Sequence, residues 1–422
     1  MPATRYPLPG SMHDPYAALR VRDFRLYLAG NLLATVGTQM QTVAVGWELY
    51  ERTHQPIALG LVGLVQVLPV ILLTLPVGHV VDRVERRVVL MASLALLSAS
   101  SLGLAVASAA HARIGWYYFA LLVAGIARAF QGPAKEALAP QLVPRALYAN
   151  SSTWRSSSWQ LASVAGPALG GAVIGTFRAA APAYVLDAVF GLCFLVMTAA
   201  MARPAFVPSR GSATLETLMA GIHFVRRTKV LLAAITLDLF AVLLGGATTL
   251  LPVFAKDILH VGPTGLGWLL AAPSVGALAM ALVLAHRPPM RRAGRALTWA
   301  VIGFGVATIV FGLSRSYWLS LGALFLTGAF DNVSVVIRAT LMQLLTPEDM
   351  RGRVGAVNSL FIGGSNELGG FESGAAAALV GPVAAVVLGG VGTIVVVLTA
   401  ARVWPEMARL GPLEDEPAPA TA

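Results

Sequence analysis

The chain has 422 residues, of which 57% are hydrophobic and only 12% are charged. A soluble domain carries about 25% charged residues, so this composition, with a mean hydropathy of +0.74, excludes a water-exposed globule. The 42 glycines and 25 prolines follow no repeating period and lie within apolar segments, which excludes a collagen-like or disordered chain. We therefore predict an all-α integral membrane protein.

The net charge of +10 and the pI near 10.2 would suggest nucleic-acid binding in a soluble chain. Here the basic residues form short clusters between apolar segments, so we expect no nucleic-acid partner. The single cysteine, Cys193, excludes an intramolecular disulfide and a cysteine-based metal site. The sequence shows no metal-ligand spacing among its histidines, and no nucleophile–base pair, phosphate-binding loop or dinucleotide fingerprint. We expect no metal, no cofactor and no enzymatic activity.

The first predicted element is a short cytoplasmic segment, residues 1–25. It is rich in proline and lacks the apolar core of a cleavable signal peptide, so we expect the first span to be retained. Twelve apolar segments follow, each close to the 20 or so residues that a helix needs to cross a bilayer. Their continuity argues against a membrane barrel, whose strands alternate polar and apolar residues. The predicted spans are 26–48, 57–80, 88–109, 115–135, 157–177, 182–202, 230–254, 265–285, 297–314, 317–342, 354–379 and 383–403.

The basic residues predict how these spans are oriented. Of the 30 Lys and Arg residues, 23 lie in the two terminal segments and in the connections after even-numbered spans, whereas 5 lie in the connections on the opposite side. Basic residues are retained on the cytoplasmic side. Both termini are therefore predicted to be cytoplasmic, in a multi-pass protein of the cytoplasmic (inner) membrane.

An internal repeat divides the chain near residue 210, with matching segments about 200 residues apart. The matches are Ala129-Phe130 with Ala329-Phe330, Gln141-Leu142 with Gln343-Leu344, and Leu169-Gly170-Gly171 with Leu368-Gly369-Gly370. Two duplicated six-helix halves are typical of a transporter whose halves rock against each other. We predict these halves at 26–202 and 229–403, a linker at 203–228 and a cytoplasmic tail at 404–422.

The linker itself predicts an amphipathic helix on the inner membrane surface, because apolar residues recur there at helical spacing. These residues are Leu215, Leu218, Ile222 and Val225.

A charged motif follows the second span, where residues 78–87 read Gly-His-Val-Val-Asp-Arg-Val-Glu-Arg-Arg. The acid and the arginines predict a latch at the cytoplasmic end, in which Asp82 pairs with basic groups or a helix N-terminus in one state and not in another. A tight turn that follows the positive-inside rule would explain the arginines but not Gly78 and Asp82. The predicted gating residues are Gly78, Asp82, Arg83, Arg86 and Arg87.

This motif resembles the signature between helices 2 and 3 of the major facilitator superfamily, Gly-x-x-x-Asp-Arg-x-Gly-Arg-Arg, although Glu85 replaces the usual glycine. Further stretches between residues 20 and 400 resemble the branch with enterobactin exporters and macrolide efflux proteins, although Leu270 stands where many relatives carry an arginine. The resemblance implies the twelve-helix major facilitator fold and efflux of a siderophore or drug in exchange for protons. The stretches include Pro133-Ala134-x-x-Ala137, Gly166-Pro167-Ala168-Leu169-Gly170-Gly171 and Leu237-Asp238-Leu239-Phe240.

The fifth span carries Gly166, Pro167, Gly170 and Gly171, which resemble a motif of exporters that exchange substrate for protons. Pro167 removes a backbone hydrogen bond and permits a kink, and the glycines allow a neighbouring helix to approach closely. This suits an interface that moves during transport. Static close packing of helices is the alternative.

Ionisable side chains within the spans are costly near the bilayer centre, so each indicates a partner or a watery cavity. Arg128, Asp331 and Glu367 lie near mid-membrane at about 1.5 Å of rise per residue. Arg338 shares a helix face with Asp331 but lies about 10.5 Å away along the axis, so we do not expect a direct pair. Glu372 lies on a different face of its helix from Glu367.

Polar positions are expected to be mirrored around a central site, and Asn31 is the approximate repeat-mate of Asp238. Proton coupling requires a carboxylate that alternates between protonated and ionised forms as access switches sides. Asp238 and Glu367 are the preferred candidates, with a fixed ion pair or a hydrogen-bonded helix contact as the alternative. Arg128 is interpreted as a counter-ion to an acid rather than a substrate ligand. Three glutamines either line the passage or bridge helices: Gln39, Gln41 and Gln66.

The sequence favours a monomeric secondary transporter that carries a small-molecule substrate across the lipid bilayer by alternating access, driven by protons. An importer, a uniporter or a lipid transporter on the same fold is the first alternative, since fold alone does not fix function. A membrane sensor or scaffold without transport is the alternative from another class, and it would tolerate loss of the acids within the membrane.

Overall fold

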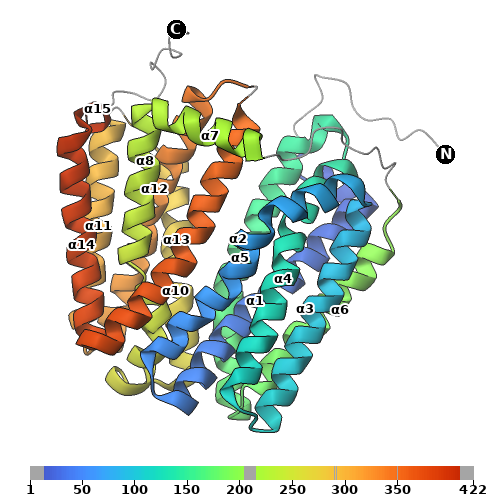
Figure 1. Cartoon of the computed structure of the whole chain (residues 1–422), viewed down its shortest axis with the longest axis horizontal. Coiled ribbons are helices and arrows are strands. Elements are labelled where there is room, and N and C mark those ends of the chain that lie inside the picture. The colour runs from blue at the N-terminus through green and yellow to red at the C-terminus, as the bar shows by residue number, and fades with distance from the viewer. Residues whose placement is uncertain (1–13, 204–214, 289, 291, 349, 409–422) are drawn as a thin grey trace.

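The computed structural model describes residues 14–203, 215–288, 290, 292–348 and 350–408, and helices account for nearly all of these residues (Figure 1). The all-α architecture predicted from composition is confirmed. A first group of six long helices forms the N-terminal half. Its helices are α1 (Arg22–Thr53), α2 (Pro56–Arg83), α3 (Arg86–Ala109), α4 (Ile114–Leu138), α5 (Tyr148–Phe177) and α6 (Ala181–Ala199).

The linker helix α7 (Leu215–Arg227) precedes the C-terminal half, which comprises the helices after it. These are α8 (Lys229–Leu244), α9 (Leu251–Val253), α10 (Gly262–Ala285), α11 (Ala293–Leu313), α12 (Tyr317–Leu345), α13 (Arg351–Val380), α14 (Pro382–Val403) and α15 (Pro405–Ala408).

Each predicted span overlaps at least one helix of the structure, although not all of them are continuous helices. Within the described residues, nine helical segments are long and apolar enough to cross a membrane. The other three predicted spans lie in α1, α4 and α13, where Gln41, Arg128 and Glu367 interrupt the apolar sequence. These three side chains also line the central cavity described below.

Span 230–254 is broken rather than continuous. Helix α8 ends at Leu244, Gly245 and Gly246 follow, and the chain continues through the 3-10 helix η4 (Ala247–Leu250), α9 and the π-helix η5 (Phe254–Ile258). A side chain at Gly246 would lie 2.7 Å from Ser373 Oγ, so the break allows a close approach to α13. Irregular backbone at membrane depth is tolerated where protein buries it or a cavity adjoins it.

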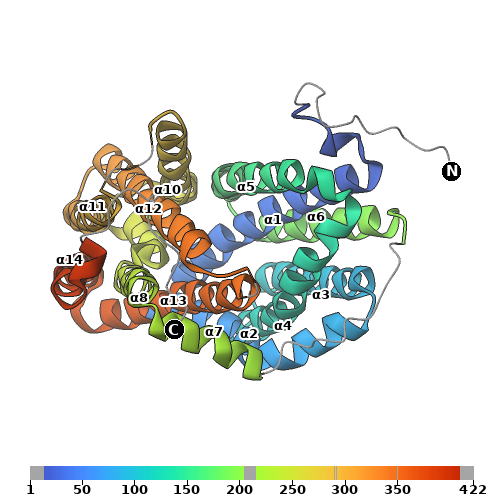
Figure 2. The same ribbon diagram turned by 90° about the horizontal axis from the view of Figure 1, so that it is seen from above.

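The two halves stand side by side, and α5 packs on α10 while α2 packs on α13 (Figure 2). We call the end of the bundle at which α7 lies the linker end, and the end with the α1–α2 connection at residues 54–55 the distal end. The tight turns at the distal end include residues with positive φ, namely His54, Arg178 and Gly381.

Helix α7 lies across the linker end (Figure 1). Its Val225 is buried in a cluster with Ile235, Val354 and Val357, and a side chain at Gly221 would lie 2.8 Å from the carbonyl oxygen of Arg353. This part of the predicted apolar face therefore contacts α8 and α13 rather than lipid. The side chains of Leu215 and Leu218 lie outside the described residues.

Candidate functional site

The first of two central cavities, the Arg128 cavity, lies between the halves and has a volume of about 170 Å³. Polar side chains from both halves line it together with apolar ones, including Leu270 at the position where relatives carry an arginine. The polar lining residues are Gln41, Thr42, Gln66 and Arg128 from the N-terminal half, and Thr248, Thr249, Asn366 and Glu367 from the C-terminal half.

The second, the Asp331 cavity, measures about 190 Å³ and lies within the C-terminal half. It adjoins the Arg128 cavity because Thr248, Thr249 and Asn366 line both. Its wall combines hydroxyls, one carboxylate and two aromatic rings. These side chains are Thr308, Thr327, Asp331, Phe304 and Phe311. A mixed wall of this kind suits a molecule with a large apolar surface and a few polar groups.

The broken span supplies the wall that the two cavities share. Thr248 and Thr249 belong to η4, which follows the Gly245–Gly246 interruption. A continuous helix would have satisfied its backbone internally and presented only one face to the passage, whereas the break turns both threonines toward the cavities. The Gly245–Gly246 pair is the sequence signal for this break. The sequence-based prediction treated residues 230–254 as one continuous helix and did not anticipate the break.

Arg128 is held by neutral groups. Its Nη2 donates to Gln41 Oε1 at 3.2 Å, and its Nη1 donates to Gln66 Oε1. Among the ion pairs of the described residues, none joins Arg128 to a carboxylate. Gln41 and Gln66 therefore both line the cavity and bridge helices, whereas Gln39 lines neither of the two cavities. Arg128 keeps its charge at the wall of the cavity.

Glu367 faces this charge from the other half. It lines the same cavity, and a side chain at Gly63 of α2 would lie 2.8 Å from Glu367 Oε2. Gly63 thus makes room for a carboxylate of the C-terminal half against the N-terminal half. An acid and an arginine on opposite halves attract each other in a way that depends on protonation of the acid. Glu372 lines neither of the two cavities.

Asp238 lies apart from both cavities and forms an ion pair with Arg338 of α12; both side chains are buried. This is the geometry of the fixed ion pair that was the alternative to a coupling role. Arg338 does not pair with Asp331, which instead lines its own cavity. In the N-terminal half, Asn31 Oδ1 accepts a hydrogen bond from Lys135 Nζ at 3.1 Å.

The halves approach each other most closely toward the distal end. A side chain at Gly171 of α5 would lie 2.9 Å from the Cα of Gly267 in α10, and one at Gly374 of α13 would lie 2.8 Å from the Cα of Gly60 in α2. In contrast, Gly166 and Gly170 face Gln39, Val36 and Met40 of α1, within the same half. Within the fifth-helix motif, Gly166 and Gly170 thus pack within the N-terminal half, whereas Gly171 packs against the other half.

Polar contacts also join the halves at the distal end. Lys256 Nζ of η5 lies 3.6 Å from Glu51 Oε1 and 5.8 Å from the ring centroid of Trp47, both on α1. Tyr50 Oη of α1 donates a hydrogen bond to Asp257 Oδ2. We call these five residues the distal contact.

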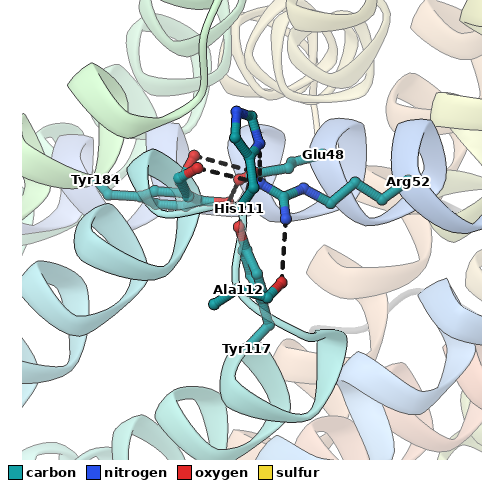
Figure 3. Close-up of polar contacts among 7 residues, drawn as sticks. Glu48, Arg52, His111, Ala112, Tyr117 and Tyr184 are labelled. Atoms are coloured by element: carbon teal, nitrogen blue, oxygen red, sulfur yellow. Dashed lines mark hydrogen bonds and ion pairs between the residues drawn. The ribbon is translucent and has the colours of Figure 1, made fainter.

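A buried acid beside the distal contact ties α1 to its own half (Figure 3). Glu48 Oε1 accepts hydrogen bonds from Arg52 at 2.6 Å, Ser108 at 2.8 Å and Tyr117 at 2.8 Å, and Oε2 accepts one from Tyr184 at 3.1 Å. Sequence reasoning missed Glu48, because it placed this residue at the end of the first span. The signal was its i, i+4 spacing to Arg52.

The charged motif at residues 78–87 contacts the end of α6, within its own half. Arg87 donates hydrogen bonds to the carbonyl oxygens of Thr198, at 2.9 Å, and Ala199, where α6 ends. Arg83 is exposed, and Gly78 and Arg86 are partly buried. The side chain of Asp82 lies outside the described residues, so the predicted latch stays a prediction.

A second buried acid that the sequence reasoning missed is Asp187 of α6, which accepts a hydrogen bond from Ser101 at 2.6 Å. It lies in a 19-residue apolar helix, and nothing in its immediate sequence distinguishes a buried carboxylate from one that faces the end of a span.

Comparisons with known proteins agree with this architecture. A family model described as transmembrane secretion effector matches residues 13–417. The multidrug efflux pump Tap of Mycobacterium tuberculosis is 29% identical over 353 residues, which cover 79% of this chain and 82% of that protein. The enterobactin exporter EntS of Citrobacter koseri is 25% identical over 377 residues, covering 88% and 89%.

Solved structures of transporters share the fold. A bacterial homolog of the human lysosomal transporter Spinster, inward-facing and unoccupied, aligns with a TM-score of 0.70 at 15% identity, covering 94% of this chain and 99% of that one. The nucleoside transporter NupG aligns with a TM-score of 0.71 at 11% identity, covering 90% and 99%. The predicted major facilitator fold is confirmed by these similarities.

Proposed function

The chain belongs to the transmembrane secretion effector family of the major facilitator superfamily, and we propose that it exports amphipathic organic molecules, drugs or siderophores, from the cytoplasm in exchange for protons. Family membership makes it a multi-pass membrane transporter of small molecules rather than an enzyme. The names of its relatives, a multidrug pump and an enterobactin exporter, support the proposed direction and substrate class.

One observation carries the proposal: a cavity between the halves has an arginine on one wall and a carboxylate on the other. Each half contributes one of the two charges, so rocking of the halves changes their separation. Protonation of Glu367 removes its attraction to Arg128, whereas loss of the proton restores it. Protonation of Glu367 therefore changes the relative stability of the states in which the halves are close together and apart. Any coupled exchange requires such a difference.

The basic residues place the linker end in the cytoplasm under this proposal. The glycine crossings and the distal contact then close the extracellular side, in a state that receives substrate from the cytoplasm. The adjoining Asp331 cavity extends the binding region into the C-terminal half. Its rings accommodate an apolar body, and its hydroxyls and carboxylate accommodate polar groups.

Inverted membrane vesicles that contain the full-length protein test this function. We use ethidium as a cationic probe and enterobactin as a catecholate probe, with an imposed inside-acid pH gradient. Export predicts accumulation of at least one probe inside these vesicles, and accumulation should rise with the gradient. Accumulation of the probes in right-side-out vesicles alone would indicate an importer and overturn the proposal, as would uptake of neither probe.

The assignment of Glu367 has a matched control on the same helix. Glu367→Gln should reduce the stimulation of probe accumulation by the pH gradient by about 5- to 150-fold, the usual range for coupling between two sites. Glu372→Gln removes a carboxylate that lines neither cavity and should retain the response. An undiminished response in Glu367→Gln would contradict the coupling role. Asp238→Asn tests the other predicted coupling residue, and its buried pair with Arg338 predicts lower stability rather than lost coupling.

A further inference from the structure

Asp187 is a buried carboxylate that lines neither central cavity. The residue is 9% exposed and lies on α6 against α1, where Gly37 makes room for it: a side chain at Gly37 would lie 2.6 Å from Asp187 Oδ1. An acid in such a place requires either a partner for its charge or a proton. Its only described hydrogen-bond partner is Ser101 of α3.

Ser101 has three neighbours and one hydrogen to donate. Its Oγ lies 2.6 Å from Asp187 Oδ2 and 3.1 Å from the carbonyl oxygen of Leu97, and it accepts a hydrogen bond from Gln41 Nε2 at 2.9 Å. A hydroxyl has one donor hydrogen and two acceptor lone pairs. Ser101 therefore donates either to Asp187 or to Leu97 at a given moment.

The two choices match the two protonation states of Asp187. When the carboxylate is ionised, Ser101 donates to it. When it carries a proton, Asp187 donates to Ser101 Oγ, and Ser101 turns its hydrogen to the carbonyl of Leu97. Both arrangements keep the buried groups hydrogen-bonded, and neither requires the heavy atoms to move. A fixed ion pair has no such second arrangement.

The same serine connects Asp187 to the cavity wall. Gln41 donates to Ser101 through Nε2 and accepts from Arg128 through Oε1 at 3.2 Å. Around Asp187, the described residues that approach from α1 and α3 are uncharged: Gly37 and Gln41, and Ser101. Arg128 of α4 is the charged group at the end of this hydrogen-bonded chain, and Glu367 lines the cavity with Arg128 from the opposite half.

We propose that Asp187 is a second proton-binding site, buried in the N-terminal half and connected through Ser101 and Gln41 to Arg128. The inference rests on the proposed proton-coupled transport. Arg128 then lies between two acids, one in its own half and one across the interface. A proton on Asp187 frees Arg128 to attract Glu367 and favours closure, whereas a proton on Glu367 favours separation of the halves.

Infrared difference spectra of the purified full-length protein, recorded between alkaline and acid pH, test proton binding without any substrate. Wild type should gain a protonated-carboxyl band on acidification that is lost in Asp187→Asn and present in Glu136→Gln, which removes an exposed acid of the same half. An Asp187→Asn spectrum identical to that of wild type would overturn the proposal.

A second pair of variants keeps the test decisive if Asp187→Asn fails to fold. Ser101→Ala retains the carboxyl but removes its switchable donor and should shift the band, whereas Ser101→Thr retains a hydroxyl and should leave it in place. A band unchanged by Ser101→Ala would show that Ser101 does not serve both states, and the proposed site would fail.

The pH profile of ethidium uptake separates this inference from the proposed function. Asp187→Asn should displace the pH of half-maximal uptake by about one pH unit or more, equivalent to about a tenfold change in proton affinity, and Asp187→Glu should restore it in part. Uptake by wild type that does not depend on the pH gradient would overturn proton coupling itself. In that case the infrared band still decides whether Asp187 binds a proton. Proton-driven uptake with an unchanged profile in Asp187→Asn overturns the inference alone.

Discussion

The two halves hold equivalent polar pairs in different ways. In the N-terminal half, Asn31 of the first helix accepts a hydrogen bond from Lys135 of the fourth helix at 3.1 Å. In the C-terminal half, Asp238 of α8 forms an ion pair with Arg338 of α12, the corresponding helices of the repeat. The C-terminal half thus pairs its buried cation with a carboxylate, whereas the described hydrogen-bond acceptor of Lys135 Nζ is an uncharged amide.

The same asymmetry is present at the central cavities. Among the described lining residues, the N-terminal half contributes Arg128, and the C-terminal half contributes Glu367 and Asp331. Among these lining residues, neither half contributes charges of both signs. Charges of opposite sign face each other across the interface between the halves. Under the proposed function, we expect protons or a charged substrate to change how strongly the halves attract each other.

The largest expected effect comes from breaking the pair in the C-terminal half. Removal of one member leaves its partner buried without compensation, which costs about 3–5 kcal/mol. Asp238→Asn and Arg338→Gln should each lower the melting temperature of the purified protein strongly, measured by thermal unfolding in detergent. Asn31→Ala, which removes an uncharged acceptor, should cost about 1 kcal/mol.

The double variant Asp238→Asn/Arg338→Gln sharpens this prediction, because it removes both charges and should recover part of the lost stability. A normal melting temperature in Asp238→Asn, together with a lost response to the pH gradient, would contradict a structural role and restore Asp238 as a coupling residue.

Much of the fold was predictable because its signals are local or repeated. Apolar length gave the spans, and the segments about 200 residues apart gave the two halves. The break at Gly245–Gly246 was missed because hydropathy averages over about 20 residues, and two glycines barely change such an average. The closeness of α8 to α13 at this point is a tertiary contact that no local pattern encodes.

The site was predictable only in part. The type of a residue indicates the free-energy cost of placing its side chain within the membrane, but not the direction in which that side chain points. Arg128 and Glu367 were identified as ionisable residues at mid-membrane, yet their placement on opposite walls of one cavity depends on helix rotation. Asp238 has the same signature and lies in a separate pair. Glu48 and Asp187 were missed in part because partners such as Ser108 and Ser101 come from other helices, 60 or more residues away in the chain.

The second prediction tests whether the halves move as units. Gly171→Val would press a side chain against α10 of the other half, and overpacking costs about 1–3 kcal/mol. This strain acts only in the closed state, so the distal end should open more often. The measurement is the labelling rate of Thr248→Cys, in a Cys193→Ser background, by an impermeant thiol reagent added at the distal side.

We expect labelling to rise about 5- to 150-fold, the change in population that corresponds to this energy. Gly166→Val is the matched control, because it presses against Gln39 of the same half. It should lower the melting temperature and leave the labelling rate unchanged. Equal labelling in the two variants would contradict rigid halves.

The third prediction introduces into the N-terminal half a carboxylate–cation pair like that of the C-terminal half. Asn31→Asp places a carboxylate beside Lys135 and mimics the pair of the C-terminal half. Because Lys135 is partly buried, the new pair should stabilise the protein by about 1 kcal/mol or less, measured as a small rise in melting temperature. Asn31→Leu, which removes the acceptor, should have the opposite effect. A loss of stability in Asn31→Asp would show that the charge of Lys135 is already compensated by a group other than Asn31.

The smallest effect concerns the last turns of α1, which serve both halves at once. Glu48 and Arg52 face their own half, whereas Trp47, Tyr50 and Glu51 face η5 of the other. The Glu51 side chain is 53% exposed, so its pair with Lys256 contributes about 0.2–1 kcal/mol and only in the closed state. Glu51→Lys should therefore increase distal labelling of Thr248→Cys modestly, and the added Lys256→Glu should reverse it.

Arg52→Gln should lower stability without changing the labelling rate, because the bond it breaks lies within one half in both states. A charge reversal at residue 51 that Lys256→Glu fails to correct would mean that this contact does not hold the halves together.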